Sequence, residues 1–200
     1  KIALCFLTTR DITHLRLWEE WWSGNEDKIS IHVHYSPDKK KNITQNILKQ
    51  NRIPITIPTS WGDVSLVRAE SLLYKHALMD RSVAFVALLS PSDIPIRTFT
   101  STYRYIMGSR RSFANAMEDH DIISDARKNQ YLCSEHLKQT PICLAHTKQY
   151  NIEHGCYPIS QWKILNRRDA KQFVTMFRDR SFVRLFTTEC MDIEPSAVAA

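Results

Sequence analysis

The sequence predicts an α/β fold: a single domain over residues 1–200, with an open, twisted, mostly parallel (mixed) sheet flanked by helices. Two observations favour this class. A continuous apolar run near the start of the chain is typical of a strand that is buried on both faces. Strand-like and helix-like stretches then alternate, which is the order that parallel strands need for their crossover connections. The domain can be part of a longer protein.

The first third of the chain carries two strands with a helix between them. Residues Ile2–Thr8 form the continuous apolar run and are expected to be a buried strand. Apolar residues then fall at helical spacing over Leu15–Trp22, which predicts a helix that ends near Gly24. Residues Ile29–Tyr35 alternate between apolar and polar, and this period of two predicts the second strand.

The middle of the chain predicts a short helix, an edge strand, a longer helix and a central strand. The short helix is expected over Asn42–Gln50. The stretch Ile53–Ile57 is β-branched but punctuated by proline, so we expect it at a sheet edge. Apolar residues recur at helical spacing over Ser65–Met79. Val83–Leu89 is the most apolar stretch of the chain and is expected to be central in the sheet.

The last part of the chain is less regular. A helix is expected over Thr98–Met107, capped by Thr98. Residues 118–157 are polar, rich in histidine and weakly periodic, so we expect short helices shaped around a cleft. A short strand over Gln161–Leu165 and a helix over Arg168–Phe177 complete the prediction.

Composition and charge narrow the classes of partner. The formal net charge of +6 and the isoelectric point near 9.1 fit an anionic partner or simply a basic surface. No stretch approaches the roughly 18 apolar residues of a membrane-spanning helix, so no membrane segment is expected. Five scattered cysteines without CxxC spacing indicate free thiols in a reducing compartment, so we expect a cytoplasmic protein; the alternative is a single disulfide.

Three loops are candidates for the functional site, because ligands of an open α/β sheet bind beyond the carboxyl ends of its strands. They are Thr8–Asp11, His34–Ser36 and Ser90–Asp93. The whole chain has four glycines and neither a GxGxxG nor a P-loop pattern, which disfavours dinucleotide oxidoreductases and P-loop kinases. A nucleotide would have to be held by side chains together with a metal or cationic groups.

Two acidic residues are the candidates for chemistry. Asp93 follows the most apolar strand, where a carboxylate can bind a divalent cation (Mn²⁺ or Mg²⁺) that bridges a diphosphate. The alternative is an aspartate that caps a turn. Glu70 lies inside an apolar helix and can act as a base if it is on the inner face. The alternative, which the sequence favours, is a solvated helix face. Arg97 can pair with phosphate or with Asp93.

Aromatic and imidazole side chains supply further candidates for binding. Trp61 precedes a glycine and can stack a base or sugar; the alternative is simple packing. His32 and His34 lie on one face of a strand and can bind a metal ion. No third ligand is identifiable, so structural imidazoles are the favoured interpretation.

One ordered set of segments spans most of the chain: Lys1–Arg10, Leu17–Glu19, Ser30–His34, Arg52–Pro54, Trp61–Gly62, Ser65–Glu70, Phe85–Thr98, Ser160–Trp162 and Asn166–Arg168. Taken together, these segments resemble the family of core 2/I-branching N-acetylglucosaminyltransferases and peptide O-xylosyltransferases, including its plant relatives. The resemblance extends to a related glycosyltransferase domain of a chlorella virus, for which the expected location would be the host cytoplasm.

The resemblance implies a GT-A-like fold. It also implies a glycosyltransferase that moves a hexose-type sugar from a UDP-sugar donor to a hydroxyl of a glycan or glycoprotein. Members with this fold place uracil and ribose near the first loop and the second strand. That correspondence falls on Thr8, Thr9, Arg10, Val33 and His34. Asp93 stands near the metal-binding acid of metal-dependent relatives, whereas core 2 enzymes work without metal, so the need for Mn²⁺ is an open expectation.

The chain departs from the family pattern at several points. Arg68 replaces an acidic residue that is common in plant relatives, and Ile159 replaces a glycine. The catalytic base of the family is an acidic residue in a motif expected just after Ala200. Either that motif lies in a longer protein, or another carboxylate serves. The candidates within the chain are Glu70, Asp93, Asp192 and Glu194.

Two functions of another class remain as alternatives. A noncatalytic domain that binds nucleic acid or another polyanion would exploit the net charge of +6. Its basic residues are dispersed and no nucleic-acid-binding motif is present, so no nucleic-acid partner is expected. A degenerate sugar-binding domain would keep the cleft and lack turnover.

Overall fold

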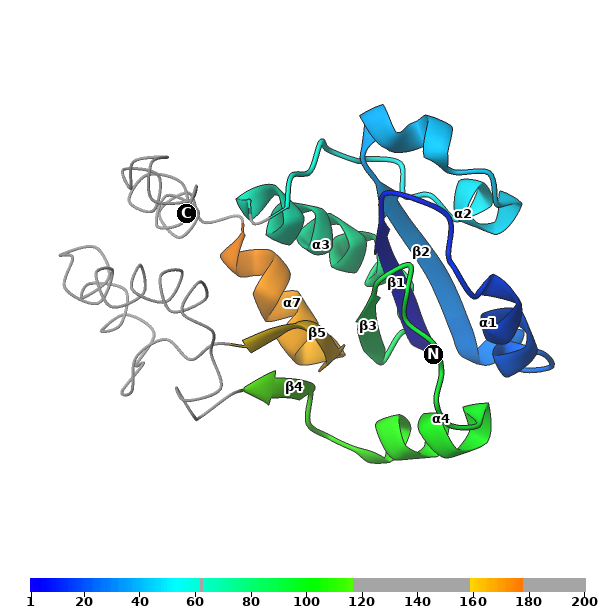
Figure 1. Ribbon diagram of the computed structural model, residues 1–200. Coiled ribbons are helices and arrows are strands. Elements are labelled where there is room, and N and C mark those ends of the chain that lie inside the picture. Colours follow the sequence, from blue (N-terminus) through cyan, green and yellow to red (C-terminus); the bar gives the residue numbers. More distant parts are fainter. Residues whose placement is uncertain (62, 117–158, 178–200) are drawn as a thin grey trace, which may run out of the picture. The chain divides into compact units, whose positions relative to one another are not determined.

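The computed structural model describes residues 1–61, 63–116 and 159–177 (Figure 1). Within them one sheet runs in the order β2-β1-β3-β5-β4. Its strands are β1 (Ile2–Thr8), β2 (Ile29–Tyr35), β3 (Phe85–Leu89), β4 (Phe113–Ala116) and β5 (Ile159–Asn166). β1 pairs in parallel with both β2 and β3, whereas β5 is antiparallel to β3. The predicted α/β fold with a mixed, mostly parallel open sheet is confirmed.

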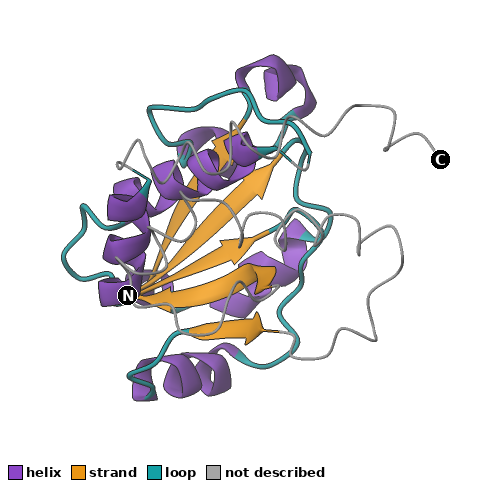
Figure 2. Ribbon diagram, turned by 90° about the vertical axis from the view of Figure 1, so that its left-hand side faces the viewer, coloured by secondary structure: helices purple, strands orange, loops and turns teal. Residues whose placement is uncertain are grey.

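Helices cover both faces of this twisted sheet (Figure 2). They are α1 (Leu15–Trp22), α2 (Asn46–Gln50), α3 (Val64–Ala77), α4 (Phe99–Gly108) and α7 (Arg167–Met176), with short 3-10 helices at Glu26–Lys28 and Pro37–Asn42. Side chains of α1 and α4 share one core cluster, and side chains of α3 and α7 share the other. In the described ranges no helix combines the length and apolarity needed to cross a membrane.

The apolar run that opens the chain is explained by the position of β1. Successive side chains of a strand point to opposite faces, and β1 has a core cluster on each. One face receives Ile2, Leu4 and Phe6, and the other receives Ala3, Cys5 and Leu7. All seven residues of the strand are buried. A strand in this position has no solvated face and therefore no polar alternation.

Aromatic rings fasten α1 to its face of the sheet. The ring of Trp18 meets that of Phe6 edge to face, with the centroids 5.6 Å apart, and stacks on Trp22 at 6.2 Å. Trp21 reaches the first residue of α4, with a centroid distance of 4.9 Å to Phe99. Because such rings bury large apolar areas, this cluster sets the position of α1 and hence of the loop before it.

Most of the predicted elements are confirmed, some with shifted ends. β1, α1 and β2 have the expected bounds, and β3 starts two residues later than the predicted strand. β3 is the central strand of the order, as expected. α3 and α4 begin at capping side chains, since Asp63 accepts from the Ser65 amide at 2.7 Å and Thr98 accepts from the Ser101 amide at 3.4 Å.

The strand predicted over Ile53–Ile57 is wrong. The structure has only an isolated parallel bridge between Val33 and Arg52, in which the Ile53 amide donates to the Val33 carbonyl at 2.9 Å. Pro54 follows immediately, and its ring fixes φ at about −65°, away from the φ of a parallel strand, so pairing stops after one step.

The helix predicted over Asn42–Gln50 begins too early. The 3-10 helix ends at Asn42, and α2 starts only at Asn46. Between them the Asp11 carboxylate accepts from the backbone amides of Thr44 (2.8 Å) and Gln45 (3.1 Å). These side-chain bonds compete with helical ones and keep the segment extended.

The sequence missed β4, a short strand with little periodicity, and β5 is longer than predicted. The helices expected within 118–157 lie outside the described residues.

Candidate functional site

The carboxyl ends of three parallel strands meet at one edge of the sheet. In the register Thr8 lies beside Tyr35, and Phe6 lies beside Leu89. The chain leaves β1 for β2 on one side and reaches β3 on the other, with α1 and α3 on opposite faces. The carboxyl ends of β1 and β3 therefore form a topological switch point, where the two connections diverge and leave a crevice for ligands.

The loop after β1 is held in a tight turn and tied to the loop after β3. The Thr8 hydroxyl donates to the Arg10 carbonyl and accepts from the Arg10 amide at 3.1 Å. The Arg10 guanidinium donates through Nη2 to the Ser92 hydroxyl at 3.1 Å. The Thr13 amide donates to the Pro91 carbonyl at 2.8 Å. Thr9 and Arg10 are exposed, so the structure holds a cationic side chain at the switch point.

Asp93 sits at the same edge and closes a turn. Its carboxylate accepts from the Ser90 amide at 2.7 Å (Oδ2) and from the Ser90 hydroxyl at 2.8 Å (Oδ1). Its carbonyl accepts from the Trp18 indole at 2.8 Å. The capping role that the sequence left open is therefore present. Each carboxylate oxygen has two lone pairs, so one bond per oxygen leaves room for a cation.

A metal ion at Asp93 would need ligands from outside the described residues. Within them no group of three or more histidine, cysteine, aspartate or glutamate side chains is arranged to hold one. Mg²⁺ and Mn²⁺ are commonly held by one or two carboxylates, with water and substrate phosphates as the other ligands. Among the described residues, the single carboxylate of Asp93 would fit a cation that arrives with a diphosphate.

Arg97 and Trp61 are exposed side chains on two different loops. The Arg97 carbonyl accepts from the Trp21 indole at 2.7 Å, which fixes the backbone and leaves the guanidinium in solvent. The Asp93 carboxylate bonds to Ser90, and among the described residues no salt bridge joins it to Arg97. Trp61 is 90% exposed. Trp61 therefore does not pack into the part of the chain that the structure describes, which was the alternative interpretation of this residue.

Val33 and His34 lie beneath the edge. Both are completely buried. His34 accepts from the Ile57 amide through Nε2 at 3.1 Å, so it holds the 53–57 segment in place. Burial, aided by the nearby Arg52 charge, lowers the pKa of His34 to about 4 and keeps the imidazole neutral. In this conformation the two residues support the site from below.

His32 is also a buried imidazole. Its Nδ1 lies 3.0 Å from Nδ1 of His76, and its Nε2 lies 3.0 Å from the Ser30 hydroxyl. Burial is the main reason, with the His76 charge second, that its pKa falls to about 4. The structural interpretation of both strand histidines fits this geometry.

Glu70 is buried and paired with a residue that the sequence did not single out. Its side chain is 2% exposed, and its Oε1 lies 2.7 Å from Nζ of Lys163 on β5, which is 14% exposed. The solvated helix face that the sequence favoured is therefore wrong. Burial raises the pKa of Glu70, while the Lys163 charge and hydrogen bonds from Lys163 and Tyr74 oppose the shift. Lys163 is two residues from the buried Leu165, and this alternation was the available signal.

An apolar pocket of about 600 Å³ lies against the sheet on the α1 side and extends from Ile2 to Leu89 and Ile94. Its lining includes Trp18, Trp21, Pro95, Arg97 and Tyr105. Of the acidic candidates, Asp93 lies at the edge and Glu70 lies inside the fold. The remaining candidates, residues 192 and 194, lie outside the described residues.

An open α/β sheet with a polar, cationic switch point defines a class of domain that binds its ligands at the carboxyl edge of the sheet. The comparisons with known proteins identify the family of this chain. A model of the Core-2/I-Branching enzyme family matches residues 2–198. The chain belongs to this family and is thus a member of a glycosyltransferase family, as the resemblance implied.

A curated relative is similar over most of the chain. Glycosyltransferase BC10 of Oryza sativa subsp. japonica is 26% identical over 178 residues, which cover 87% of this chain. The chain spans 40% of the length of that relative.

Proposed function

We propose that this chain carries the donor-binding part of a glycosyltransferase. The enzyme would transfer a hexose-type sugar from a UDP-sugar to a hydroxyl group of a glycan or glycoprotein. The observation that carries the proposal is the Arg10–Ser92 bridge at the switch point of the sheet. It holds a positive charge where α/β domains of this topology bind nucleotides. Membership of the Core-2/I-Branching family supports the same activity.

At this edge the phosphates of a nucleotide would be bound by side chains and not by the backbone of a glycine-rich loop. Among the described glycines only Gly24 has a positive φ, and it follows α1 and is not part of the switch-point loops. The phosphates would be bound by guanidinium groups, which pair with phosphate oxygens through two parallel hydrogen bonds. The bond to Ser92, which holds Arg10 at the switch point, supports this role for Arg10, and Arg97 is an exposed second guanidinium on the segment that follows Asp93.

Transfer also needs a carboxylate that removes the proton of the acceptor hydroxyl while cationic groups stabilise the departing UDP. Glu70 is 2% exposed and its carboxylate is paired with Lys163, so an acceptor hydroxyl has no open approach to it in this structure. Asp93 is the partly exposed candidate acid at the edge, and its two bonds to Ser90 orient it there. A bound divalent cation would add positive charge beside the diphosphate.

Replacing Arg10 with glutamine is expected to weaken UDP binding by roughly tenfold or more, because a charged hydrogen-bond donor to phosphate is lost. Isothermal titration calorimetry with UDP, UDP-sugars, ADP and GDP measures the effect. Thermal shift offers a second readout, since a ligand that binds only the folded state raises the melting temperature.

Arg16→Gln is the matched control for the Arg10 variant. Arg16 lies on the outer face of α1, has a 90% exposed side chain and pairs with Glu20 in the same helix. UDP affinity should be unchanged in this variant. Equal weakening in both variants would mean that the net charge, and not the switch point, binds UDP. Indifference to the base of the nucleotide would remove the UDP assignment.

Asp93→Asn tests the proposed divalent cation. Asparagine keeps one oxygen that can accept from the Ser90 amide, its NH2 group can donate to the Ser90 hydroxyl, and the charge is removed, so Mn²⁺ should no longer raise the affinity for UDP. Asp38→Asn is the control, because Asp38 follows β2, accepts from the neighbouring Ser36 hydroxyl and is exposed. An Mn²⁺ effect of equal size in wild type and Asp93→Asn would place the metal elsewhere.

A further inference from the structure

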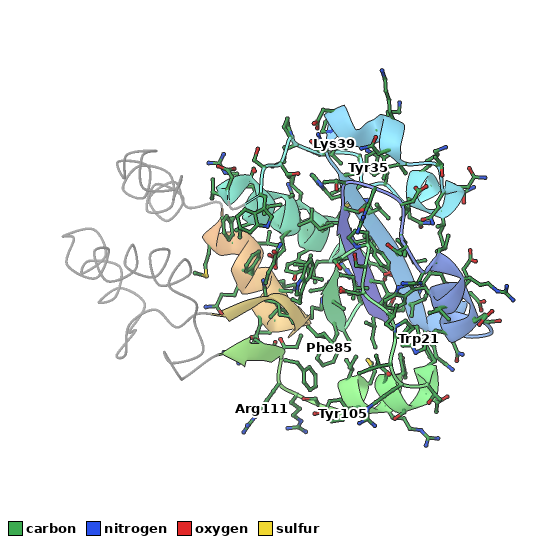
Figure 3. All side chains as sticks on the ribbon, in the orientation of Figure 1. Trp21, Tyr35, Lys39, Phe85, Tyr105 and Arg111 are labelled. Atoms are coloured by element: carbon green, nitrogen blue, oxygen red, sulfur yellow. The ribbon has the colours of Figure 1, made fainter. Side chains whose placement is uncertain are left out.

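A second polar pocket lies at the opposite edge of the sheet, where β3 begins and β5 ends. It has a volume of about 730 Å³ and is lined by residues 81–85, 109–112 and 166–169. Figure 3 shows Phe85 and Arg111 toward this end of the sheet and Tyr35 toward the other. We propose that this pocket is an anion site that binds a phosphate-type group, separately from the switch point.

The lining carries an excess of positive charge. It contains Arg81, Arg110, Arg111, Arg167 and Arg168, against the single carboxylate of Asp169. Four of the five arginines are exposed, all except Arg167. That carboxylate is already engaged, because it accepts from the Ser112 hydroxyl. Among the described residues no salt bridge involves any of the five guanidinium groups. Like charges held together repel one another, and a bound anion would relieve this cost.

Arg167 has a different role from the other arginines, since it builds the wall of the pocket. Its Nη1 donates to the carbonyls of Asp80 (2.9 Å) and Val83 (2.8 Å), and its Nη2 donates to the carbonyl of Leu78 (2.8 Å). These bonds fix the turn after α3, from which Arg81 projects.

The turn after α4 is fixed in the same way. Ser112 accepts from the Asn166 amide at 2.9 Å, and the Asn166 side chain donates to the Arg110 carbonyl at 3.1 Å. The Ser109 hydroxyl bonds to both the amide and the carbonyl of Arg111, at 3.0 and 3.1 Å. Backbone and hydroxyl groups are thus used internally, and the guanidinium groups remain as the donors for a ligand. A preorganised frame lowers the entropic cost of binding.

The backbone at the start of α7 contributes little to the proposed anion site, because two of its amides are already bonded within the protein. The Arg167 amide donates to the Ala84 carbonyl at 2.7 Å, and the Asp169 amide donates to the Asn166 side chain at 2.9 Å. The ligand chemistry is therefore set by exposed arginine side chains from three turns. Guanidinium groups match the oxygens of a phosphate geometrically, whereas a carboxylate presents only two oxygens. The pocket, with a volume of about 730 Å³, has room for a phosphate group together with a small carrier such as a sugar.

The test uses the 200-residue chain, titrated calorimetrically at constant ionic strength with inorganic phosphate and with glucose 6-phosphate. Saturable binding is expected, weakened roughly tenfold or more in Arg110→Gln/Arg111→Gln. The side chains of both arginines are exposed, so the variant should fold. Arg16→Gln/Arg104→Gln is the control, because it removes the same charge from exposed positions of α1 and α4 outside the pocket. UDP affinity should be equal in the two variants.

The two probes distinguish a free phosphate from one carried on a sugar. Equal affinities would mean that the oxyanion alone is bound, and tighter binding of glucose 6-phosphate would mean that the carrier is bound as well. Three results would overturn the proposal: no saturable binding of either probe, equal weakening in the control variant, or displacement of phosphate by UDP. Tighter binding of a short RNA that depends on the same two arginines would also overturn it, in favour of a polyanion surface.

Discussion

Replacing Glu70 with alanine is expected to lower the free energy of unfolding by about 3–5 kcal/mol, the range seen when one partner of a buried ion pair is removed. Lys163 would keep a positive charge in a position that is only 14% exposed, without the carboxylate that now lies 2.7 Å away. The lost carboxylate also leaves a space beside Tyr74, which is fully buried. Urea-induced unfolding followed by circular dichroism measures the loss.

The double variant Glu70→Leu/Lys163→Met separates the charge from the packing. A buried pair replaced by apolar side chains of similar volume is often neutral or stabilising, so most of the stability should return. Glu20→Ala is the control for a surface pair; it should cost less than about 1 kcal/mol, since its partner Arg16 is 90% exposed. If the stability losses of Glu70→Leu and Lys163→Met simply add in the double variant, the two side chains are not coupled, and the ion pair does not explain the loss.

Lowering the pH from 6.5 to 4 is expected to remove about 3 kcal/mol of stability for each of His32 and His34. Burial lowers the pKa of both imidazoles from 6.5 to about 4. Their contribution is fully present above pH 6.5, where both states are neutral. It is lost as the pH falls toward 4, because the unfolded chain takes up the protons first.

Unfolding free energies measured at several pH values test this expectation. His34→Gln offers an oxygen to the Ile57 amide and does not titrate, so the acid slope should decrease. His14→Gln is the control, since His14 is exposed and should leave the slope unchanged. An unchanged slope in His34→Gln would show that this imidazole is not held neutral by the fold.

Glu70 contributes with the opposite sign. Its pKa is raised above the ordinary value of 4.5, so its contribution is present below that value and is lost as the pH rises through the raised pKa. As the pH rises above 4.5 through the raised pKa, wild type should lose this contribution and Glu70→Gln should not. The free energy of unfolding of Glu70→Gln, relative to that of wild type, should therefore increase with pH. The histidine and glutamate windows overlap but have opposite signs, so the His34→Gln and Glu70→Gln variants are needed to separate the two effects.

The apolar periods of the sequence predicted most of the fold. β1 was predictable because a strand that is buried on both faces gives a continuous apolar run. α1 was predictable because a helix that is buried along one stripe gives apolar residues at helical spacing. The segment after Arg52 was not, since one proline stopped the pairing that β-branched residues favoured. The break before α2 depends on Asp11, thirty-three residues earlier in the chain than Thr44, and local pattern carries no sign of it.

For the site, sequence order placed Thr8, Arg10 and Asp93 at one edge, because parallel strands end together. The identity of each partner was beyond the sequence. Arg10 reaches Ser92 and not Asp93, and Glu70 meets Lys163 from a strand at the far side of β3. These pairings depend on how the strands are ordered across the sheet.

By itself the sequence determined the class of fold and the family resemblance and predicted the edge that we propose for ligand binding, because each depends on spacing along the chain. Only the tertiary structure decided that Glu70 is buried and paired, that His34 supports the site from below, and that five arginines line one pocket at the other edge. Burial and charge clustering arise from residues that are distant in sequence, so they exist only once the sheet is assembled.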